Sequence, residues 1–146
     1  MEPKLQAEQH FEAGYSCSQS ILMAYAPLFN LDRDTAARLA APFGGGVARR
    51  GETCGAVNGA FMVIGLKCGH TSPEDVDSKE RAFQAVQDFI AHFHDRYGSI
   101  GCIQLLEIDI SSPEGLQLAH EAQLFTTRCP GYVTHTADLL DQLISG

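Results

Sequence analysis

The sequence predicts an all-α fold, a single-domain helical bundle of about five to seven helices. Apolar residues recur at helical spacing, while the period-2 alternation of strands is almost absent. Signals that start and stop helices follow one another closely, with no linker or low-complexity segment between them. The 146 residues, 45% hydrophobic and 19% charged, are enough for one buried core. We therefore expect residues 1–146 to form one domain with short connections.

In the first half of the chain, helix signals are clearest where a capping residue precedes an apolar run. The segment "SCSQ" at 16–19 has the form of a capping box, in which Ser16 and Gln19 satisfy each other's backbone N–H groups. Thr53 is expected to cap a helix that is apolar nearly all round, as a helix in the middle of a bundle would be. The helices expected here cover residues 3–13, 16–29, 32–41 and 53–69.

The second half of the chain begins with the helix signal "SPED" at 72–75. It combines a Ser N-cap, Pro at the first helical position and acids in the first turn. It predicts a long helix closed by Gly98, with one buried apolar stripe: Val76, Phe83, Val86, Ile90, Phe93 and Tyr97. Further helices are expected over 102–106, 112–127 and 130–144.

Charge and hydropathy exclude several classes of function. The net charge of -8 and the absence of a basic run argue against a nucleic-acid partner. The N-terminus "MEPKLQAEQH" lacks the apolar segment of a signal peptide. The apolar run after Thr53 is too short for a membrane span and is interrupted by glycines. We expect a cytoplasmic protein with no membrane span, and the sequence leaves its oligomeric state open.

Five cysteines in a chain expected in the reducing cytoplasm need an explanation. Four lie at expected helix starts, where unpaired N–H groups and the helix dipole stabilise a thiolate and lower its pKa: Cys17, Cys54, Cys102 and Cys129. Cys68 lies at a helix end, where this effect is reversed, and is expected to serve packing. Because no Cys-x-x-Cys occurs, the four thiols can meet only through the fold.

The surroundings of Cys54 are unusual because a glycine-rich loop with two arginines precedes it. Such glycines permit backbone conformations closed to other residues, and successive N–H groups in the loop can bind an anion. Two more glycines, one helical turn apart, would let a helix or a bound group approach the backbone. The alternative is a plain tight turn with solvated arginines. The candidate cofactor-binding positions are Gly44, Gly45, Gly46, Gly55 and Gly59.

Five segments of the chain together resemble one family: "GYSCSQS", "FGGG", "GETCGAVNGAFMVIGLK", "YGSIGCIQLL" and "CPGYVTHTADLL". They are similar to the C_GCAxxG_C_C family of redox-active proteins, from about Phe11 to Ile144. The segment "CGAVNG" matches the family's Cys-Gly-Ala-x-x-Gly block. By position, the family's four cysteines fall on Cys17, Cys54, Cys102 and Cys129. The resemblance implies an iron–sulfur cluster and an oxidoreductase or transporter-associated redox partner.

Three hypotheses about function stay open, and the sequence does not decide whether the protein is an enzyme. In the first, the four cysteines ligate an iron–sulfur cluster for electron transfer. In the second, the protein is a metal-free thiol–disulfide oxidoreductase or redox sensor, with Cys54 as the attacking thiolate and Cys17 as a second catalytic cysteine. In the third, the cysteines bind zinc, or the bundle is a structural or binding module without a cofactor.

Overall fold

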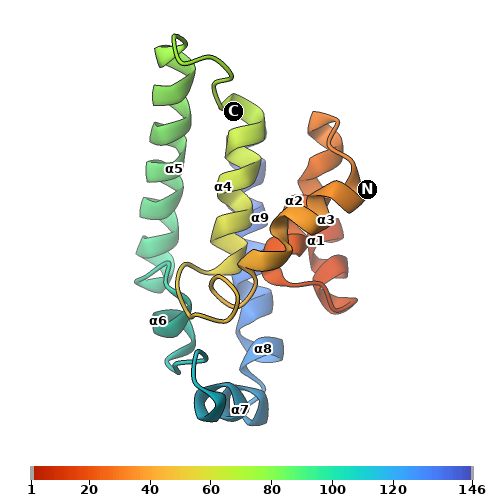
Figure 1. Ribbon diagram of the computed structural model, residues 1–146, viewed down its shortest axis with the longest axis vertical. Coiled ribbons are helices and arrows are strands. Elements are labelled where there is room, and N and C mark those ends of the chain that lie inside the picture. The colour runs from red at the N-terminus through yellow and green to blue at the C-terminus, as the bar shows by residue number, and fades with distance from the viewer. Residues whose placement is uncertain (1, 146) are drawn as a thin grey trace.

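The computed structural model describes residues 2–145 and confirms the all-α fold (Figure 1). Within these residues, seven α-helices have eight or more residues, and α6 and α8 are shorter. Extended backbone pairs only in an isolated bridge between Thr53 and Gly101 in the described part of the chain. The elements are α1 (Pro3–Glu12), α2 (Cys17–Tyr25), η1 (Ala26–Phe29), α3 (Arg33–Ala40), η2 (Ala41–Phe43), α4 (Gly55–Cys68), α5 (Val76–Tyr97), α6 (Cys102–Leu106), α7 (Pro113–Glu121), α8 (Leu124–Thr127) and α9 (Cys129–Ser145).

The capping box at the start of α2 is confirmed. The Ser16 hydroxyl accepts from the Gln19 N–H at 3.3 Å, and the Ser16 N–H donates to the Gln19 side chain at 3.1 Å. Asp32 caps α3 by accepting from the Thr35 N–H at 3.0 Å. Each cap satisfies N–H groups that the helix itself leaves unpaired, which contributes about 1 kcal/mol per cap.

Two predicted helix starts are wrong by one and by three residues. The N-cap of α4 is Cys54, because Thr53 is held in extended conformation by its bridge to Gly101. The N-cap of α5 is Asp75, whose side chain accepts from the Ser78 N–H, so the segment 72–75 forms a turn before the helix. Cys54 is therefore the cap residue itself, and its backbone is not helical.

Two predicted helices are each interrupted. The helix expected over 16–29 continues after α2 as the 3-10 helix η1, which contains Pro27. The helix expected over 112–127 is broken at Gln123, whose φ of 58° lies in the left-handed region. The Gln123 carbonyl accepts from the hydroxyl groups of Thr126 and Thr127, so this break is stabilised locally.

Helix α4 lies in the middle of the molecule, as its apolar sequence predicts. In Figure 1, α5 stands on one side of α4, α9 lies behind it, and α1, α2 and α3 lie on the other side. The N-terminal ends of α4 and α9 lie at the same end of the bundle, close to the short helices α6 and α8 (Figure 1). This end of the bundle therefore gathers several helix starts.

Close packing of α4 on α2 depends on a glycine, which leads to a prediction. A Cβ at Gly59 would lie 2.9 Å from the Ile21 Cβ and 3.0 Å from the Ser18 carbonyl oxygen, whereas a Cβ at Gly65 would have no atom within 4 Å. Gly59→Ala should lower the free energy of unfolding by about 1–3 kcal/mol through overpacking. Gly65→Ala should raise it by about 0.5–1 kcal/mol, because alanine favours a helix. Urea unfolding measures both, and equal effects would contradict the close approach.

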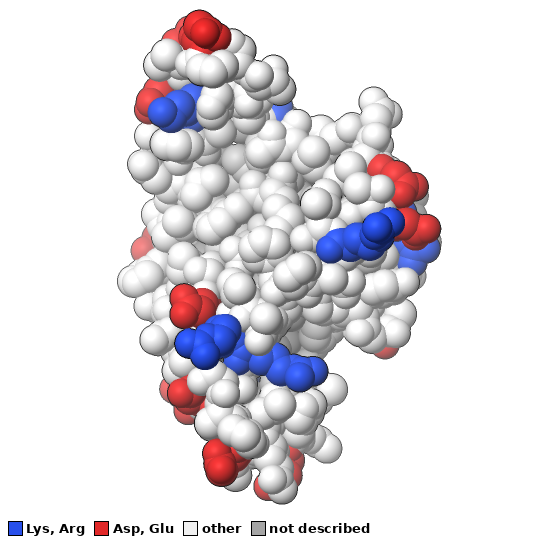
Figure 2. Space-filling model, in the orientation of Figure 1, with Lys and Arg blue, Asp and Glu red and all other residues white. Residues whose placement is uncertain are grey.

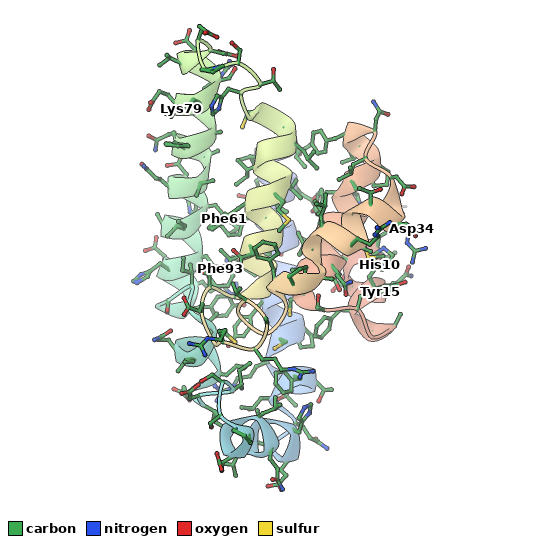
Figure 3. All side chains as sticks on the ribbon, viewed as in Figure 1. His10, Tyr15, Asp34, Phe61, Lys79 and Phe93 are labelled. Carbon is green, nitrogen blue, oxygen red and sulfur yellow. The ribbon has the colours of Figure 1, made fainter. Side chains whose placement is uncertain are left out.

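Of the apolar stripe predicted for α5, only Phe93 is fully buried. Phe89, which the predicted stripe did not include, is also buried. Val86, Ile90 and Tyr97 are partly buried, whereas Val76 is 56% exposed and Phe83 52% exposed, so the prediction of a buried stripe is wrong for its first half. The reason is that α5 extends past the end of α4 (Figure 1). Phe61 of α4 and Phe93 of α5 lie where these two helices face each other (Figure 3). Neither α5 nor any other helix of residues 2–145 has the length and apolar character to cross a membrane.

Candidate functional site

Four cysteines from four parts of the chain line one cavity of about 780 Å³: Cys17, Cys54, Cys102 and Cys129. All four are free thiols, and three are almost completely buried, with exposed fractions of 5% for Cys54 and 8% for Cys102 and Cys129. Cys68 does not line this cavity, and its thiol donates to the Ile64 carbonyl at 3.2 Å within α4. The fold therefore separates Cys68 from the other cysteines.

Cys54 and Cys102 are held beside each other by a short antiparallel pairing of backbone. The Cys54 N–H donates to the Ile100 carbonyl at 2.7 Å, and the Cys102 N–H donates to the Glu52 carbonyl at 2.6 Å. These two hydrogen bonds tie the residues before α4 to the residues before α6. The backbone, more than side-chain packing, fixes the separation of the two thiols.

Cys17 reaches the cavity because α2 and α4 approach closely at their N-terminal ends. A Cβ at Gly55 would lie 3.3 Å from the Cys17 Cβ and 3.2 Å from the Phe43 carbonyl oxygen. Because Gly55 has no side chain, Cys17 fits against it, and Gly55 directly follows Cys54 in the chain. The sequence predicted this kind of approach at Gly55 but not its partner.

Cys129 is placed by the two residues Arg128 and Tyr132, which sequence reasoning missed. The Tyr132 hydroxyl donates to the Leu105 carbonyl at 2.8 Å. The Arg128 guanidinium donates to the carbonyls of Leu105 and Leu106 at 3.1 and 3.2 Å. Both side chains satisfy carbonyls that the end of α6 leaves unpaired, and so hold the start of α9 against α6. No sequence signal pointed to them, because Arg128 lies in the turn before α9 and both side chains bind backbone carbonyls of a distant segment.

The glycine loop before α4 forms a left-handed turn. The φ angles are 68° at Gly45, 67° at Gly46, 65° at Val47, 51° at Ala48 and 64° at Arg49. Each residue other than glycine costs about 1–2 kcal/mol in this conformation. The two glycines were predicted to need unusual backbone, but the three residues after them gave no such signal. Such strain is typical of ligand sites and switch regions.

The N–H groups of this loop are mostly engaged within it. The Ala48 N–H donates to the Pro42 carbonyl and the Glu52 N–H to the Gly46 carbonyl, each at 2.8 Å, and those of residues 47 and 49–51 donate to other loop carbonyls. These groups are therefore not available to bind an anion. The N–H groups of Gly45 and Gly46 donate to no other described residue, so the anion nest expected from the glycines stays a prediction. The loop contributes to the cavity as a wall. Contact of its glycines with a cofactor stays a prediction.

Burial has a larger effect on the pKa values of the Cys54 and Cys102 thiols than the positions of these residues at helix starts. Desolvation raises the pKa of Cys54 to about 11, although the N–H groups of Ala56 and Val57 oppose the rise. These two N–H groups face the Cys54 sulfur, but the Cys54 side chain makes no capping hydrogen bond. Desolvation raises the pKa of Cys102 to about 12, and the neighbouring Cys54 and Cys129 add to this. The expectation that helix starts lower the pKa of all four thiols is therefore wrong.

The pKa values of Cys17 and Cys129 depend on each other. Hydrogen bonding between their thiols raises the pKa of Cys17, and burial raises it further. The same contact lowers the pKa of Cys129, because Cys17 acts as the donor to the Cys129 sulfur, while burial opposes it. Cys129, and not Cys54 as predicted, is therefore the most acidic of the four.

The raised pKa values predict that alkaline pH destabilises the reduced, metal-free protein. Cys54 and Cys102 keep their protons in the folded state to about pH 11 and 12, but lose them near pH 9 when unfolded. The free energy of unfolding should be unaffected by these groups below pH 9 and fall between pH 9 and about 11, at most about 1.4 kcal/mol per pH unit per thiol. Urea unfolding at several pH values measures this fall. The double variant C54S/C102S should reduce the slope, and an unchanged slope would contradict the prediction.

The side chains of the described residues do not form a site for a single metal ion. Within residues 2–145, no group of three or more His, Cys, Asp or Glu side chains is arranged to hold one. The four cysteines share a cavity, but they do not converge on one point. This arrangement does not fit the tetrahedral set that one zinc ion needs.

Comparison with known proteins gave one match. The family model described as putative redox-active protein (C_GCAxxG_C_C) matches residues 15–143, a span that includes all four cavity cysteines. Searches of curated proteins and of solved structures each found no match to the chain.

Proposed function

Because the chain belongs to the C_GCAxxG_C_C family of putative redox-active proteins, we propose that it transfers electrons through an iron–sulfur cluster ligated by Cys17, Cys54, Cys102 and Cys129. One observation carries this proposal: these four cysteines, and not Cys68, line a single cavity. Four thiolates are the usual ligand set of [2Fe–2S] and [4Fe–4S] clusters. We further propose that the electrons pass to or from an oxidoreductase partner in the cytoplasm.

The arrangement suits a cluster better than a single ion. In a cluster, the cysteines bind separate iron atoms or opposite ends of the group, so their sulfurs need to surround a volume and not one point. A cavity of about 780 Å³ lined by cysteines of α2, α6 and α9 and by the N-cap residue of α4 is compatible with that requirement.

A bound cluster supplies one-electron transfer, and the residues of this chain set the conditions. Three ligands are nearly inaccessible to water, which limits hydrolysis of the group. The N–H groups of Ala56 and Val57 face the Cys54 sulfur and favour its anionic form. Such N–H contacts raise the reduction potential of the centre. Gly46 and Gly55 keep the cavity wall free of side chains where the backbone approaches Cys102 and Cys17.

Anaerobic purification from a host able to assemble clusters tests the proposal. We expect a brown protein with visible absorption and equal amounts of iron and acid-labile sulfide. The absorption should bleach on reduction with dithionite. A colourless protein without iron and sulfide, purified in parallel with a known cluster protein that retains both, would refute it.

A second candidate function rests on the contact between Cys17 and Cys129. Both residues line the cavity, and hydrogen bonding between their thiols raises the pKa of Cys17 and lowers that of Cys129, so this pair is the candidate for a reversible disulfide. In this scheme the Cys129 thiolate attacks one sulfur of a substrate disulfide and displaces the other as a thiolate. Cys17 then loses its proton and attacks Cys129, which releases the second substrate thiol and leaves a Cys17–Cys129 disulfide. The substrate disulfide is the oxidant, so the electrons balance.

Peptide mapping separates the two candidates. If the protein is a dithiol carrier, the iron-free protein oxidised by an excess of glutathione disulfide should contain a Cys17–Cys129 linkage, with Cys54 and Cys102 still free. If no such linkage forms while iron and sulfide are retained after purification, the cluster is the better account.

A further inference from the structure

The cavity is larger than the cysteine cluster and extends beyond the elements that carry it. Four elements without a cavity cysteine, α1, η2, α7 and α8, also contribute to its wall. Its volume of about 780 Å³ is in the range of sites for small organic molecules. These cysteine-free walls are mainly apolar or aromatic: Phe11, Leu116, Phe125 and, from the connection before α7, Ile110. This side of the cavity has no evident role in holding a metal centre.

Most polar groups of the wall are already engaged within the chain. The Tyr132 hydroxyl donates to Leu105, the Thr126 hydroxyl to Gln123, and Ser16 caps α2. Arg49 and His120 also line the cavity, and among the described residues their side chains make no hydrogen bond or ion pair, although their backbones do. The wall thus offers an apolar surface together with two hydrogen-bond donors.

Arg49 is brought to the cavity by the strained loop. It is the last residue of the left-handed turn, and its side chain packs over Gly45, where a Cβ would lie 3.0 Å from the Arg49 Cγ. Figure 2 shows basic side chains gathered over the region where Figure 1 places this loop, while the face over α4 carries little charge. The cost of the left-handed turn is explained if the loop serves to present this side chain to a ligand.

The charges of the cavity favour a neutral ligand. Glu12 lies on the wall, and the sulfurs of a redox centre are negative, so both repel an anion. Arg49 disfavours a cation in the same way. A neutral, planar, mostly apolar molecule with oxygen acceptors matches the aromatic wall and the two donors together.

We propose that this part of the cavity binds a quinone, whose carbonyl oxygens accept hydrogen bonds from Arg49 and His120. The electron-transfer part rests on the proposed function, because the four-cysteine centre supplies the electrons. Two reduced protein molecules give one electron each, two protons are taken from solvent, and the quinone leaves as the hydroquinone. A low-potential one-electron donor protein then reduces the centre again.

A tryptophan reporter makes binding measurable, because the chain has no tryptophan. Phe125→Trp places the indole on the cavity wall, and Phe83→Trp places it on the exposed first half of α5 as the matched control. Duroquinone is a suitable probe because its ring carries four methyl groups and cannot add a thiol. We expect saturable quenching of the fluorescence of F125W and only weak, linear quenching of F83W.

Arginine variants in the F125W background identify the donor. Arg49→Met should weaken duroquinone binding roughly 3–10-fold, because the methionine side chain cannot donate the hydrogen bond. Arg38→Met makes the same change on α3, outside this cavity, and should leave the dissociation constant unchanged. Thermal unfolding of each variant checks that it is folded, and His120→Leu provides a second test of donor loss if Arg49→Met does not fold.

The outcomes separate this inference from the proposed function. Linear quenching in both reporters overturns the quinone site and leaves the iron and sulfide result standing. Duroquinone binding by folded Arg49→Met and His120→Leu variants that equals binding by F125W alone overturns it in the same way. Saturable quenching of F125W in a protein that contains no iron or sulfide would support the quinone site and refute the cluster. With both present, mixing dithionite-reduced and desalted protein with duroquinone should give one hydroquinone per two protein molecules, and no hydroquinone would overturn the electron-transfer part.

Discussion

Serine in place of any one of Cys17, Cys54, Cys102 and Cys129 is expected to lower the iron and sulfide content of the anaerobically purified protein at least about tenfold. A serine hydroxyl is a poor ligand for a cluster that four thiolates hold. The four variants should behave alike even though their residues come from α2, α6, α9 and the residue before α4, because all four line one cavity. Iron and sulfide analysis with the visible spectrum measures the loss.

Cys68→Ser is the matched control for this series. Its thiol donates to the Ile64 carbonyl within α4 and lies outside the cavity, and a serine hydroxyl can make the same bond. This variant should keep the iron, the sulfide and the spectrum of the unmodified protein. Loss of colour in Cys68→Ser, or full iron content in two of the four cavity variants, would contradict the ligand assignment.

Gly46→Ala should have the largest effect on stability of the single changes at the site. A Cβ on Gly46 would lie 2.6 Å from the Cys102 Cβ and 2.7 Å from the Glu52 backbone nitrogen, and its φ of 67° is unfavourable for alanine. The Glu52 carbonyl accepts from the Cys102 N–H, so the clash pushes directly on the pairing that holds Cys54 near Cys102. We expect a loss of about 3 kcal/mol or more in the free energy of unfolding.

Gly14→Ala separates the steric part of this effect from the backbone part. Gly14 also has a positive φ, 108°, but a Cβ there would meet no atom within 4 Å. Its replacement should therefore cost only the conformational penalty, about 1 kcal/mol. Urea unfolding and the iron content of both variants measure the difference, and a smaller loss for Gly46→Ala than for Gly14→Ala would show that the loop does not press against Cys102.

Local features of the fold could be predicted because their causes lie within a few residues. The capping box of Ser16 and Gln19 depends only on neighbouring atoms, and it was found in the structure. The errors arose where a distant segment changed the local outcome. Thr53 did not cap α4 because Gly101 pairs with it, and the stripe of α5 is half exposed because α4 ends before it.

The sequence predicted which cysteines line the candidate site, but it did not predict their pKa values or the residues that position Cys129. The resemblance to the family and the positions near helix starts selected the four cysteines that line the cavity. The pKa values could not be predicted, because the effect of burial on Cys54 and Cys102 exceeds that of the nearby N–H groups. Arg128 and Tyr132 were missed because their partners are the carbonyls at the end of α6, which only the folded chain brings near.

The sequence by itself determined the helical class, the family and which cysteines to examine, since periodicity, caps and motifs are written in short segments. The tertiary structure alone decided that four thiols from distant segments share one cavity, that Cys17 pairs with Cys129, and that the loop before α4 turns left-handed. The physical reason is that proximity, desolvation and backbone strain depend on contacts between residues far apart in the chain.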